Sequence, residues 1–266
     1  MGVAPYVLVN VLRALLSSLL AVSLAAGSVA GVAAQDEADD PLQAAVPARI
    51  LFIGNSHTER FGGLDWLVGN MVAAEGTSRP YAADRRTASG VTLEYHFRNG
   101  APEAIRTGGY DTVVLQDHLP GAAVPSTAPF LQYATKLHSR VVLAGAETVL
   151  FMTWPQGKRD WADLDDFVAA HREAEARLGA RVAPVGVAFA NAQAERPDLV
   201  LIGEDTIHAT WAGAYLAAAT VYATLFDRSP EGLPYTFGIS EEDAAFLQRI
   251  AWQTLTDWRA GIPAAE

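Results

Sequence analysis

The sequence predicts an α/β fold, a three-layer α/β/α sandwich with an open, five-stranded parallel sheet between two layers of helices. Apolar runs of strand length alternate along the chain with longer segments of helical period, which indicates parallel strands joined by crossover helices. The chain has 266 residues, of which half are hydrophobic and under a fifth are charged, so it can bury the core that such a sheet needs.

Five strands are expected, each a short apolar or mixed run bounded by turn residues. The clearest is YDTVVLQ at 110–116, and the weakest lies within 81–87. The expected strands, in chain order, are 49–54, 81–87, 110–116, 147–153 and 181–187.

Helical periodicity predicts five longer helices between and after these strands. They are 60–75, 129–145, 163–178, 210–226 and 240–258. Ser240 is suited to be an N-cap, and Asp243 stands three residues on, as in a shorter-armed capping box. His138 and His171 fall inside two of the expected helices, and we interpret them as solvent-facing residues.

The first 34 residues differ from the rest of the chain. They contain no acidic residue and one basic residue, Arg13, followed by a short apolar run and then by small residues. This pattern predicts a signal peptide over 1–34 that is cleaved after Ala34, and hence a secreted or periplasmic protein without a stable membrane span. An uncleaved anchor is the alternative, although the run is marginal for a full span. Residues 35–47 are acidic and then Ala/Pro-containing, which predicts a linker before a single domain over 48–266.

Charge and cysteine content exclude several functions. The formal net charge is -11, and phosphate contacts need a basic face, so no nucleic-acid partner is expected. Cysteine is absent, which excludes disulfides, thiolate metal ligands and a cysteine nucleophile.

Polar residues stand where the expected strands end. In an open parallel sheet, ligands bind at the carboxyl ends of the strands. Ser56 follows the first strand in the run ILFIGNSHT. A serine in this place is often only a helix cap, because its hydroxyl bonds the free N–H groups of a first turn. To act as a nucleophile it needs a base, and the base needs an orienting carboxylate.

Asp205 and His208 match that need. In DTIH a carboxylate stands three residues before an imidazole, just ahead of a long expected helix, so both can project from one turn toward the sheet edge. The alternative is that Asp205 is a turn residue and His208 a polar residue near a helix start. His118 also follows a strand and remains a candidate. His57 adjoins Ser56, and we expect its side chain to point away from the same pocket.

Four stretches together resemble the sequence blocks of the SGNH (GDSL-like) hydrolase superfamily, over roughly residues 48–230. ILFIGNSHT resembles the first block, and DTIHATWAGAYLAAATVYATLFDRSP resembles the last, Asp-x-x-His followed by a helix rich in Gly, Ala and Tyr. ASGVTLEYHF supplies Gly90 at the glycine of the second block. YDTVVLQDH places Gln116 where most members of the superfamily carry asparagine. Gly-Asn-Ser with this glutamine is similar to a bacterial, often exported, branch with no assigned substrate.

The resemblance implies a flavodoxin-like SGNH hydrolase fold and a serine esterase mechanism. Ser56 would be the nucleophile, His208 the base and Asp205 the residue that orients the base. The implied oxyanion hole is the backbone N–H of Ser56, the backbone N–H of Gly90 and the side-chain amide of Gln116. No cofactor and no metal are implied.

The substrate class follows less directly. The chain carries no long apolar insertion that would form a lid, so we expect a small acyl ester, such as an acetyl ester, of a small molecule or a glycan. The same residues suit acyl transfer.

Asn55 would tie the first-strand loop to a neighbouring loop, and the helix expected from Arg60 would aim its positive end at the site.

Two other functions stay open. The scaffold can carry an inert Ser56 and act as a binding protein, a reading that the departure at Gln116 motivates. A metal-dependent phosphoesterase can use Asp and His at strand ends, although two such pairs are sparse for a two-metal site. The residues concerned are Asp117, His118, Asp205 and His208. Candidate pocket walls are His57, His118 and Trp154.

Overall fold

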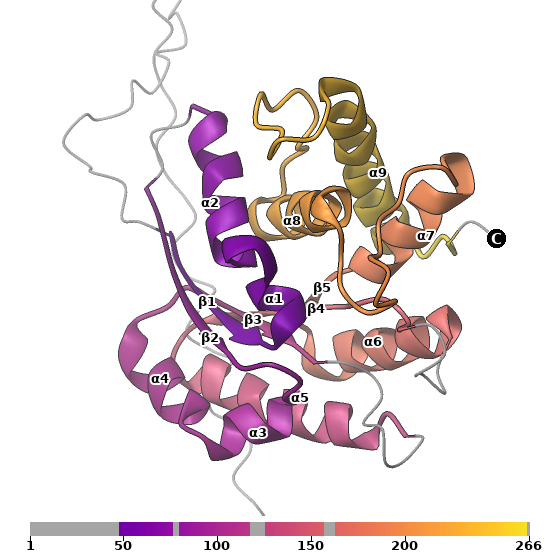
Figure 1. Ribbon diagram of the computed structural model, residues 1–266. Helices are drawn as coiled ribbons and strands as arrows, with labels where there is room; N and C mark the ends of the chain where they lie inside the picture. The colour runs from indigo at the N-terminus through magenta and orange to yellow at the C-terminus, as the bar shows by residue number, and fades with distance from the viewer. Residues whose placement is uncertain (1–47, 77–79, 118–125, 157–162, 265–266) are drawn as a thin grey trace, which may run out of the picture. The chain divides into compact units, whose positions relative to one another are not determined.

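The computed structural model describes residues 48–76, 80–117, 126–156 and 163–264, all of which lie in one unit, Ala44–Glu266. The described strands form one parallel sheet in the order β2-β1-β3-β4-β5 (Figure 1). They are β1 (Ala48–Gly54), β2 (Tyr81–Thr87), β3 (Thr112–Gln116), β4 (Glu147–Phe151) and β5 (Arg181–Ala183). The predicted five-stranded parallel sheet of flavodoxin-like order is confirmed. The predicted signal peptide and linker lie outside the described residues.

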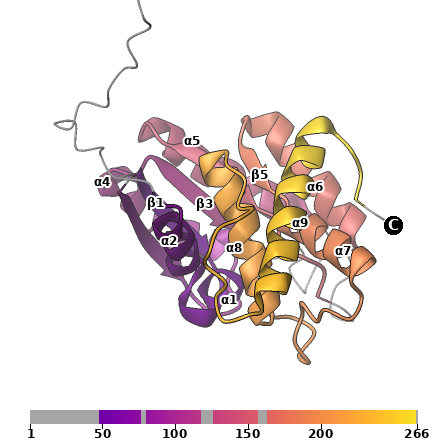
Figure 2. The ribbon, with the colours of Figure 1, turned by 90° about the horizontal axis from the view of Figure 1, so that it is seen from above.

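Helices cover both faces of the sheet, as predicted. Because successive side chains of a strand point to opposite faces, Ile50 and Phe52 of β1 pack into one core and Leu51 and Ile53 into the other. The first core is shared with α2 (Leu64–Ala74), α7 (Val185–Glu195), α8 (Trp211–Phe226) and α9 (Glu241–Ala260). The second is shared with α3 (Leu93–Arg98), α4 (Ala101–Gly108), α5 (Ala128–Leu143) and α6 (Leu164–Leu178). Both views show α8 beside α9 (Figures 1 and 2).

The strand order places a topological switch point between β1 and β3. From β1 the chain passes to one edge of the sheet, and from β3 it passes toward the other. Ligand sites of open α/β sheets lie in the crevice outside the carboxyl ends of such strands. Ser56, the first residue of the short helix α1 (Ser56–Glu59), follows β1 here, and Gln116 ends β3.

The predicted strand 181–187 is wrong in its second half. β5 ends at Ala183, and α7 begins at Val185. Pro184 takes the N-cap position between them, with φ -83° and ψ 56°. A Cβ on Gly186 would lie 2.3 Å from the carbonyl oxygen of Thr153, so glycine lets the new helix pass close to the end of β4. An apolar run alone does not distinguish a buried strand from a buried helix.

The predicted helix 60–75 is broken. One turn of helix (α1) is followed by a 3-10 turn (Arg60–Gly62), and the longer α2 begins only at Leu64. Phe61 has φ 57°, a left-handed conformation that interrupts the helix. The helix N-terminus at the site is therefore that of the one-turn helix α1, and not that of a long helix as expected. The sequence patterns did not predict α3 and α4, which are short.

The two helical histidines are not solvent-facing. His171 is 2 % exposed, and its ring lies 4.7 Å from that of Phe130. It stands four residues after Phe167 on the apolar face of α6, where its Nδ1 lies 2.8 Å from the Phe167 carbonyl oxygen. Burial lowers the pKa of His171 to about 4. His138 is half-buried, with its Nδ1 3.0 Å from Thr148 Oγ1.

The predicted cap of the last helix is confirmed, since the backbone N–H of Asp243 donates to Ser240 Oγ at 3.0 Å. The Asp243 carboxylate accepts from Arg196 at 2.8 Å. A full capping box, with reciprocal bonds, is formed by Asp163 and Asp166 at the start of α6. Within the described ranges, no helix has the length and apolar character that crossing a membrane requires.

Candidate active site

Three side chains from two distant segments form a hydrogen-bonded chain at the carboxyl edge of the sheet. Ser56 Oγ lies 2.8 Å from His208 Nε2, although 152 positions separate the two residues. His208 Nδ1 lies 2.7 Å from Asp205 Oδ2. A carboxylate can only accept, so Nδ1 carries the proton, and Nε2 is left to accept from the serine hydroxyl.

Asp205 is held by its own loop. Its Oδ1 accepts from the backbone N–H groups of Ile207 at 3.0 Å and His208 at 2.9 Å. The bonds from the His208 backbone, the His208 ring and the Ile207 backbone hold the pKa of the Asp205 carboxyl far below its usual range. Thr206 lies inside this turn with φ 58°, which a β-branched residue rarely adopts. The carboxylate is therefore ionised at neutral pH and fixed toward the imidazole.

Trp154 fastens the same loop to the sheet. Its Nε1 donates to the carbonyl oxygen of Ile207 at 3.0 Å, and its ring stacks on Phe189 of α7 at 4.2 Å. The backbone N–H of Gly203 also donates to the His208 carbonyl oxygen, at 2.8 Å. The end of β4 thus positions the histidine, a role that the sequence did not reveal.

On the serine side, Asn55 ties the first-strand loop to its neighbour, as expected. Asn55 Nδ2 donates to the carbonyl oxygen of Val91 at 3.0 Å, and Asn55 Oδ1 accepts from the backbone N–H of His57 at 3.1 Å. β1 and β2 pair at Gly54 and Thr87, so the loops that follow them begin side by side. This brings the segment containing Gly90 next to the residue that precedes Ser56.

Gln116, the last residue of β3, supports the same turn. Its Oε1 accepts from the backbone N–H of Asn55 at 2.8 Å and from Thr58 Oγ1 at 2.9 Å. The side chain is fully buried, and its Nε2 has no hydrogen-bond partner among the described residues. Gly90 is exposed and has φ 67°, and a Cβ there would meet no atom within 4 Å. Glycine is favoured at this position by the backbone conformation and not by crowding from a neighbouring protein atom.

The expectation that His57 points away is wrong. Its ring lies 5.7 Å from that of His208 and 4.9 Å from that of Trp154. Successive residues of a helix diverge by about 100°, not 180°, so the neighbour of Ser56 can still face the same region. His57, Arg60, Trp154 and His208 line a hollow of about 10 Å³, which has room for about one water molecule. Ser56 does not line it, so the hollow borders the base.

Two buried residues whose structural role the sequence did not reveal also hold the site. His96 Nε2 lies 2.7 Å from the Gly54 carbonyl oxygen, and burial lowers the pKa of His96. Asp117 is buried, and its Oδ2 accepts from the backbone N–H of Leu93 at 3.1 Å. Only their positions in the sequence could have indicated these roles, because a histidine or an aspartate at such places is not typical of any one function. His118 lies outside the described residues, and among those described no three His, Cys, Asp or Glu side chains are grouped as metal ligands would be.

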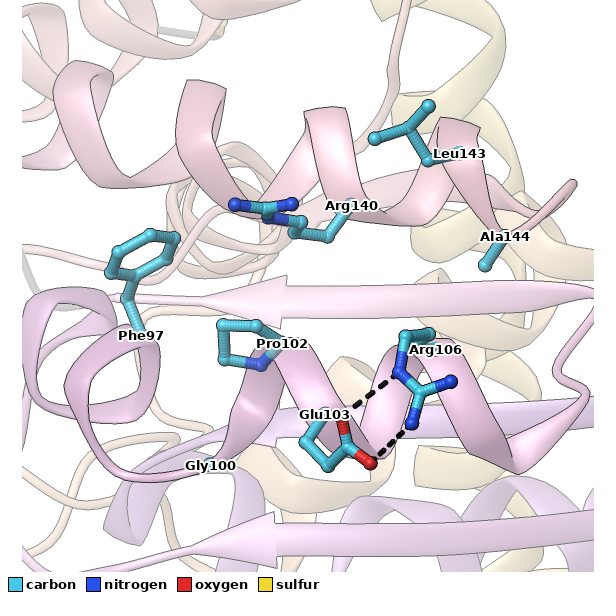
Figure 3. A pocket seen from close by; sticks show the side chains of 8 residues that line it. All are labelled: Phe97, Gly100, Pro102, Glu103, Arg106, Arg140, Leu143 and Ala144. Carbon is cyan, nitrogen blue, oxygen red and sulfur yellow. Dashed lines mark hydrogen bonds and ion pairs between the residues drawn. The ribbon is translucent and has the colours of Figure 1, made fainter.

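A larger cavity, of about 480 Å³, lies elsewhere, between the α3–α4 segment and the C-terminal half of α5 (Figure 3). Glu103 and Arg106, both on α4, form an ion pair on one wall, with N–O distances of 2.9 and 2.6 Å. Arg140 of α5 lies on the other wall (Figure 3). None of Ser56, Asp205 and His208 lines this cavity.

The comparisons with known proteins show the fold. No family model and no curated protein matches the sequence. A crystal structure of a DUF4886 family protein from Bacteroides uniformis matches with a TM-score of 0.60 and 18 % identity, over 82 % of this chain and 98 % of that one. An acetyl xylan esterase matches at 0.58 and 14 %, over 67 % and 100 %. The esterase EstA from Pseudoalteromonas sp., inhibited by monoethylphosphonate, matches at 0.52 and 16 %, over 68 % and 97 %. This chain therefore shares its α/β fold with esterases.

Proposed function

We propose that this protein is a serine ester hydrolase of the SGNH type. The observation that carries the proposal is the chain of contacts from Ser56 Oγ through His208 to Asp205, at 2.8 and 2.7 Å. A serine hydroxyl is a weak nucleophile unless a base removes its proton, and a carboxylate-bound imidazole is such a base. The likeness of the fold to esterases supports the same class of reaction, by analogy.

The reaction proceeds in two halves. Ser56 Oγ attacks the ester carbonyl carbon while His208 Nε2 takes its proton, and Asp205 stabilises the imidazolium. The tetrahedral intermediate collapses, the C–O bond to the alcohol breaks, and His208 protonates the leaving alcohol. Water then attacks the acyl-enzyme with His208 again as base, which releases the acid and restores Ser56. An acceptor alcohol in place of water gives acyl transfer.

The backbone N–H of Ser56 and that of Gly90 are the first two donors that we assign to the oxyanion. The Asn55–Val91 bond supports this pairing, because it joins the two loops that carry them. Gln116 is the third donor of the proposal. Its Nε2 is buried, so a substrate reaches this atom only if the side chain or the neighbouring loop shifts on binding. One such donor is typically worth about 10²–10³ in rate.

The substrate that we propose is a small acyl ester, such as an acetyl ester, of a small molecule or a glycan. Two similar folds belong to proteins named acetyl xylan esterase and acetyl-xylooligosaccharide esterase. We further propose that residues 1–34 direct export, so that the enzyme acts outside the cell or in the periplasm, on the pattern of Arg13, an apolar run and small residues.

The first test is turnover of a short-chain chromogenic ester by the purified protein and by Ser56→Ala, with and without a chelator. We expect kcat/KM to fall by about 10⁴ or more in the variant and to be insensitive to the chelator. Mass spectrometry after treatment with an alkyl phosphonate should find one adduct, on Ser56. Activity lost with the chelator but kept in Ser56→Ala would favour the metal-dependent alternative. The absence of both turnover and an adduct would favour an inert binding protein.

A further inference from the structure

Four aromatic side chains form one cluster, which we call the aromatic wall: Phe61, Trp66, Trp211 and Phe237. The rings of Phe61 and Trp211 are 4.6 Å apart, and those of Trp211 and Phe237 are 4.7 Å apart. The ring centres of Trp66 and Phe237 lie 6.0 Å apart. The two indoles are 50 % and 55 % exposed, although side chains of this size are usually mostly buried.

Two members of the wall adjoin the candidate site along the chain. Trp211 follows His208 by three residues, a reach of at most about 11 Å along the chain. Phe61 follows Ser56 by five residues and adjoins Arg60, which lines the hollow next to His208. Two of the four members of the wall thus come from the segments that carry the nucleophile and the base.

Two of its members have strained backbones. Phe61 has φ 57° and Phe237 has φ 55°, in the left-handed region that bulky residues avoid. Their rings lie 6.1 Å apart, and Phe237 is buried behind the exposed indoles. Thr206, within the Asp205–His208 turn, has the same kind of conformation. Such strain persists where the surrounding structure holds it, and it is concentrated at active sites and ligand clamps.

The mechanism decides which part of an ester meets this wall. His208 delivers a proton to the leaving alcohol, so the alcohol must lie on the side of His208, whereas the acyl oxygen faces the N–H groups of Ser56 and Gly90. Trp211 is close to His208 along the chain, and Phe61 adjoins Arg60, which lines the hollow next to His208, so the alcohol portion of the substrate is the part that can reach the wall.

Polar groups lie at the rim of the wall. Arg85 Nη1 bonds the Asp65 carboxylate at 2.7 Å and the Gly62 carbonyl oxygen at 2.6 Å, directly beside Trp66. Arg60 is exposed and lies 5.1 Å from the Phe61 ring. A sugar has apolar C–H faces, which stack on indoles, and hydroxyls at its edge, which bond such polar groups. An alkyl alcohol packed on the Phe61 ring would instead desolvate the exposed Arg60 guanidinium without offering it a hydrogen-bond acceptor.

We propose that the aromatic wall is a subsite for a sugar ring, so that the substrate is an acylated glycan cleaved from its sugar hydroxyl. This inference rests on the proposed esterase function for its catalytic meaning, but the binding that it requires can be measured without turnover.

The kinetic test compares three kinds of acetate ester: acetylated xylo- and cello-oligosaccharides, octyl acetate, and ethyl acetate, whose two-carbon alcohol has neither a ring nor a long chain to pack on the wall. In Trp211→Ala and Trp66→Ala we expect the ratio of kcat/KM for the glycan esters to that for ethyl acetate to fall about tenfold. Trp211→Phe should restore most of it. The matched control is Trp252→Ala, a half-buried tryptophan of α9. An unchanged ratio would overturn the proposal, and so would a loss confined to octyl acetate.

Binding separates this proposal from the esterase proposal. Tryptophan fluorescence of Ser56→Ala, titrated with unacylated xylo- and cello-oligosaccharides, should report saturable binding that weakens about tenfold when Trp211→Ala is added. If such binding is found but no ester is hydrolysed, the sugar subsite stands and the esterase fails. If esters are hydrolysed but no oligosaccharide binds, the subsite fails and the esterase stands.

Discussion

The hollow beside His208 and the cavity between α4 and α5 differ in size and in chemistry. The α4–α5 cavity measures about 480 Å³, and the hollow beside His208 about 10 Å³. In the larger one, Glu103 and Arg106 pair within a single helix, at the exposed surface. At the smaller one, His208 links two segments of the chain. In this fold, connected reactive groups locate the candidate chemistry better than volume does.

Two histidines show the same contrast. His208 bonds Asp205 through one ring nitrogen and Ser56 through the other, so both nitrogens belong to a polar chain that reaches solvent. His171 bonds only a backbone carbonyl among the contacts described for it, and it is buried against Phe130. The first arrangement can pass a proton, and the second stabilises a neutral ring.

The largest expected effect sets the two hollows directly against each other. His208→Ala removes the base, and we expect kcat/KM for a short-chain ester to fall by about 10⁴ or more. Arg140→Ala alters the wall of the larger cavity and should leave kcat/KM within about twofold. Steady-state kinetics of both variants, with thermal unfolding to show that each is folded, makes the comparison. A larger loss in Arg140→Ala than in His208→Ala would reverse the assignment of the two hollows.

The buried histidine predicts a pH dependence of stability. The pKa of His171 is about 4 in the folded protein and 6.5 when the side chain is not buried, as in the unfolded protein. Between pH 6.5 and pH 4, therefore, the unfolded state binds a proton that the folded state does not. The stability from His171 is therefore fully present above pH 6.5 and is lost as the pH falls to 4, by about 3 kcal/mol.

Urea unfolding of the wild type and of His171→Leu between pH 7 and pH 4 measures this loss. His96 and His138 also have pKa values lowered by burial, so only the difference between the two proteins isolates His171. The variant should lose less stability over this range than the wild type. Parallel pH profiles for the two proteins would show that His171 is not the source.

Much of the fold was predictable because its signals are local. Short apolar or mixed runs between turn residues predicted all five strands, including the mixed run of β2. The predicted N-cap at Ser240 is also present. The errors fell where tertiary contacts decide. Val185–Val187 is apolar enough for a strand, but Pro184 and the close approach of Gly186 to β4 turn it into a helix.

The candidate site divides in the same way. Ser56 was singled out because it follows a strand, and Asp205 and His208 because a carboxylate stands three residues before an imidazole. The resemblance to the SGNH superfamily joined the three, and the structure does bring them together. Among the supports, the tie made by Asn55 was expected, but those made by Gln116 and Trp154 were not. Gln116 accepts from a backbone N–H 61 residues away, and Trp154 donates to a carbonyl 53 residues away. No local pattern records which side chain will find such a partner.

The smallest expected effect concerns Trp154, and it tests whether that support acts on the reaction. Trp154→Phe keeps an aromatic ring against Phe189 but loses the bond to Ile207, which is worth about 1 kcal/mol and should lower kcat/KM about three- to tenfold. Trp258→Phe is the matched control, because it also loses an indole bond, to Glu175, but in the core on the α5–α6 side. Both variants should lose similar stability in urea unfolding, and only Trp154→Phe should lose activity. Equal activities in the two would mean that the loop holds His208 in place without its bond to β4.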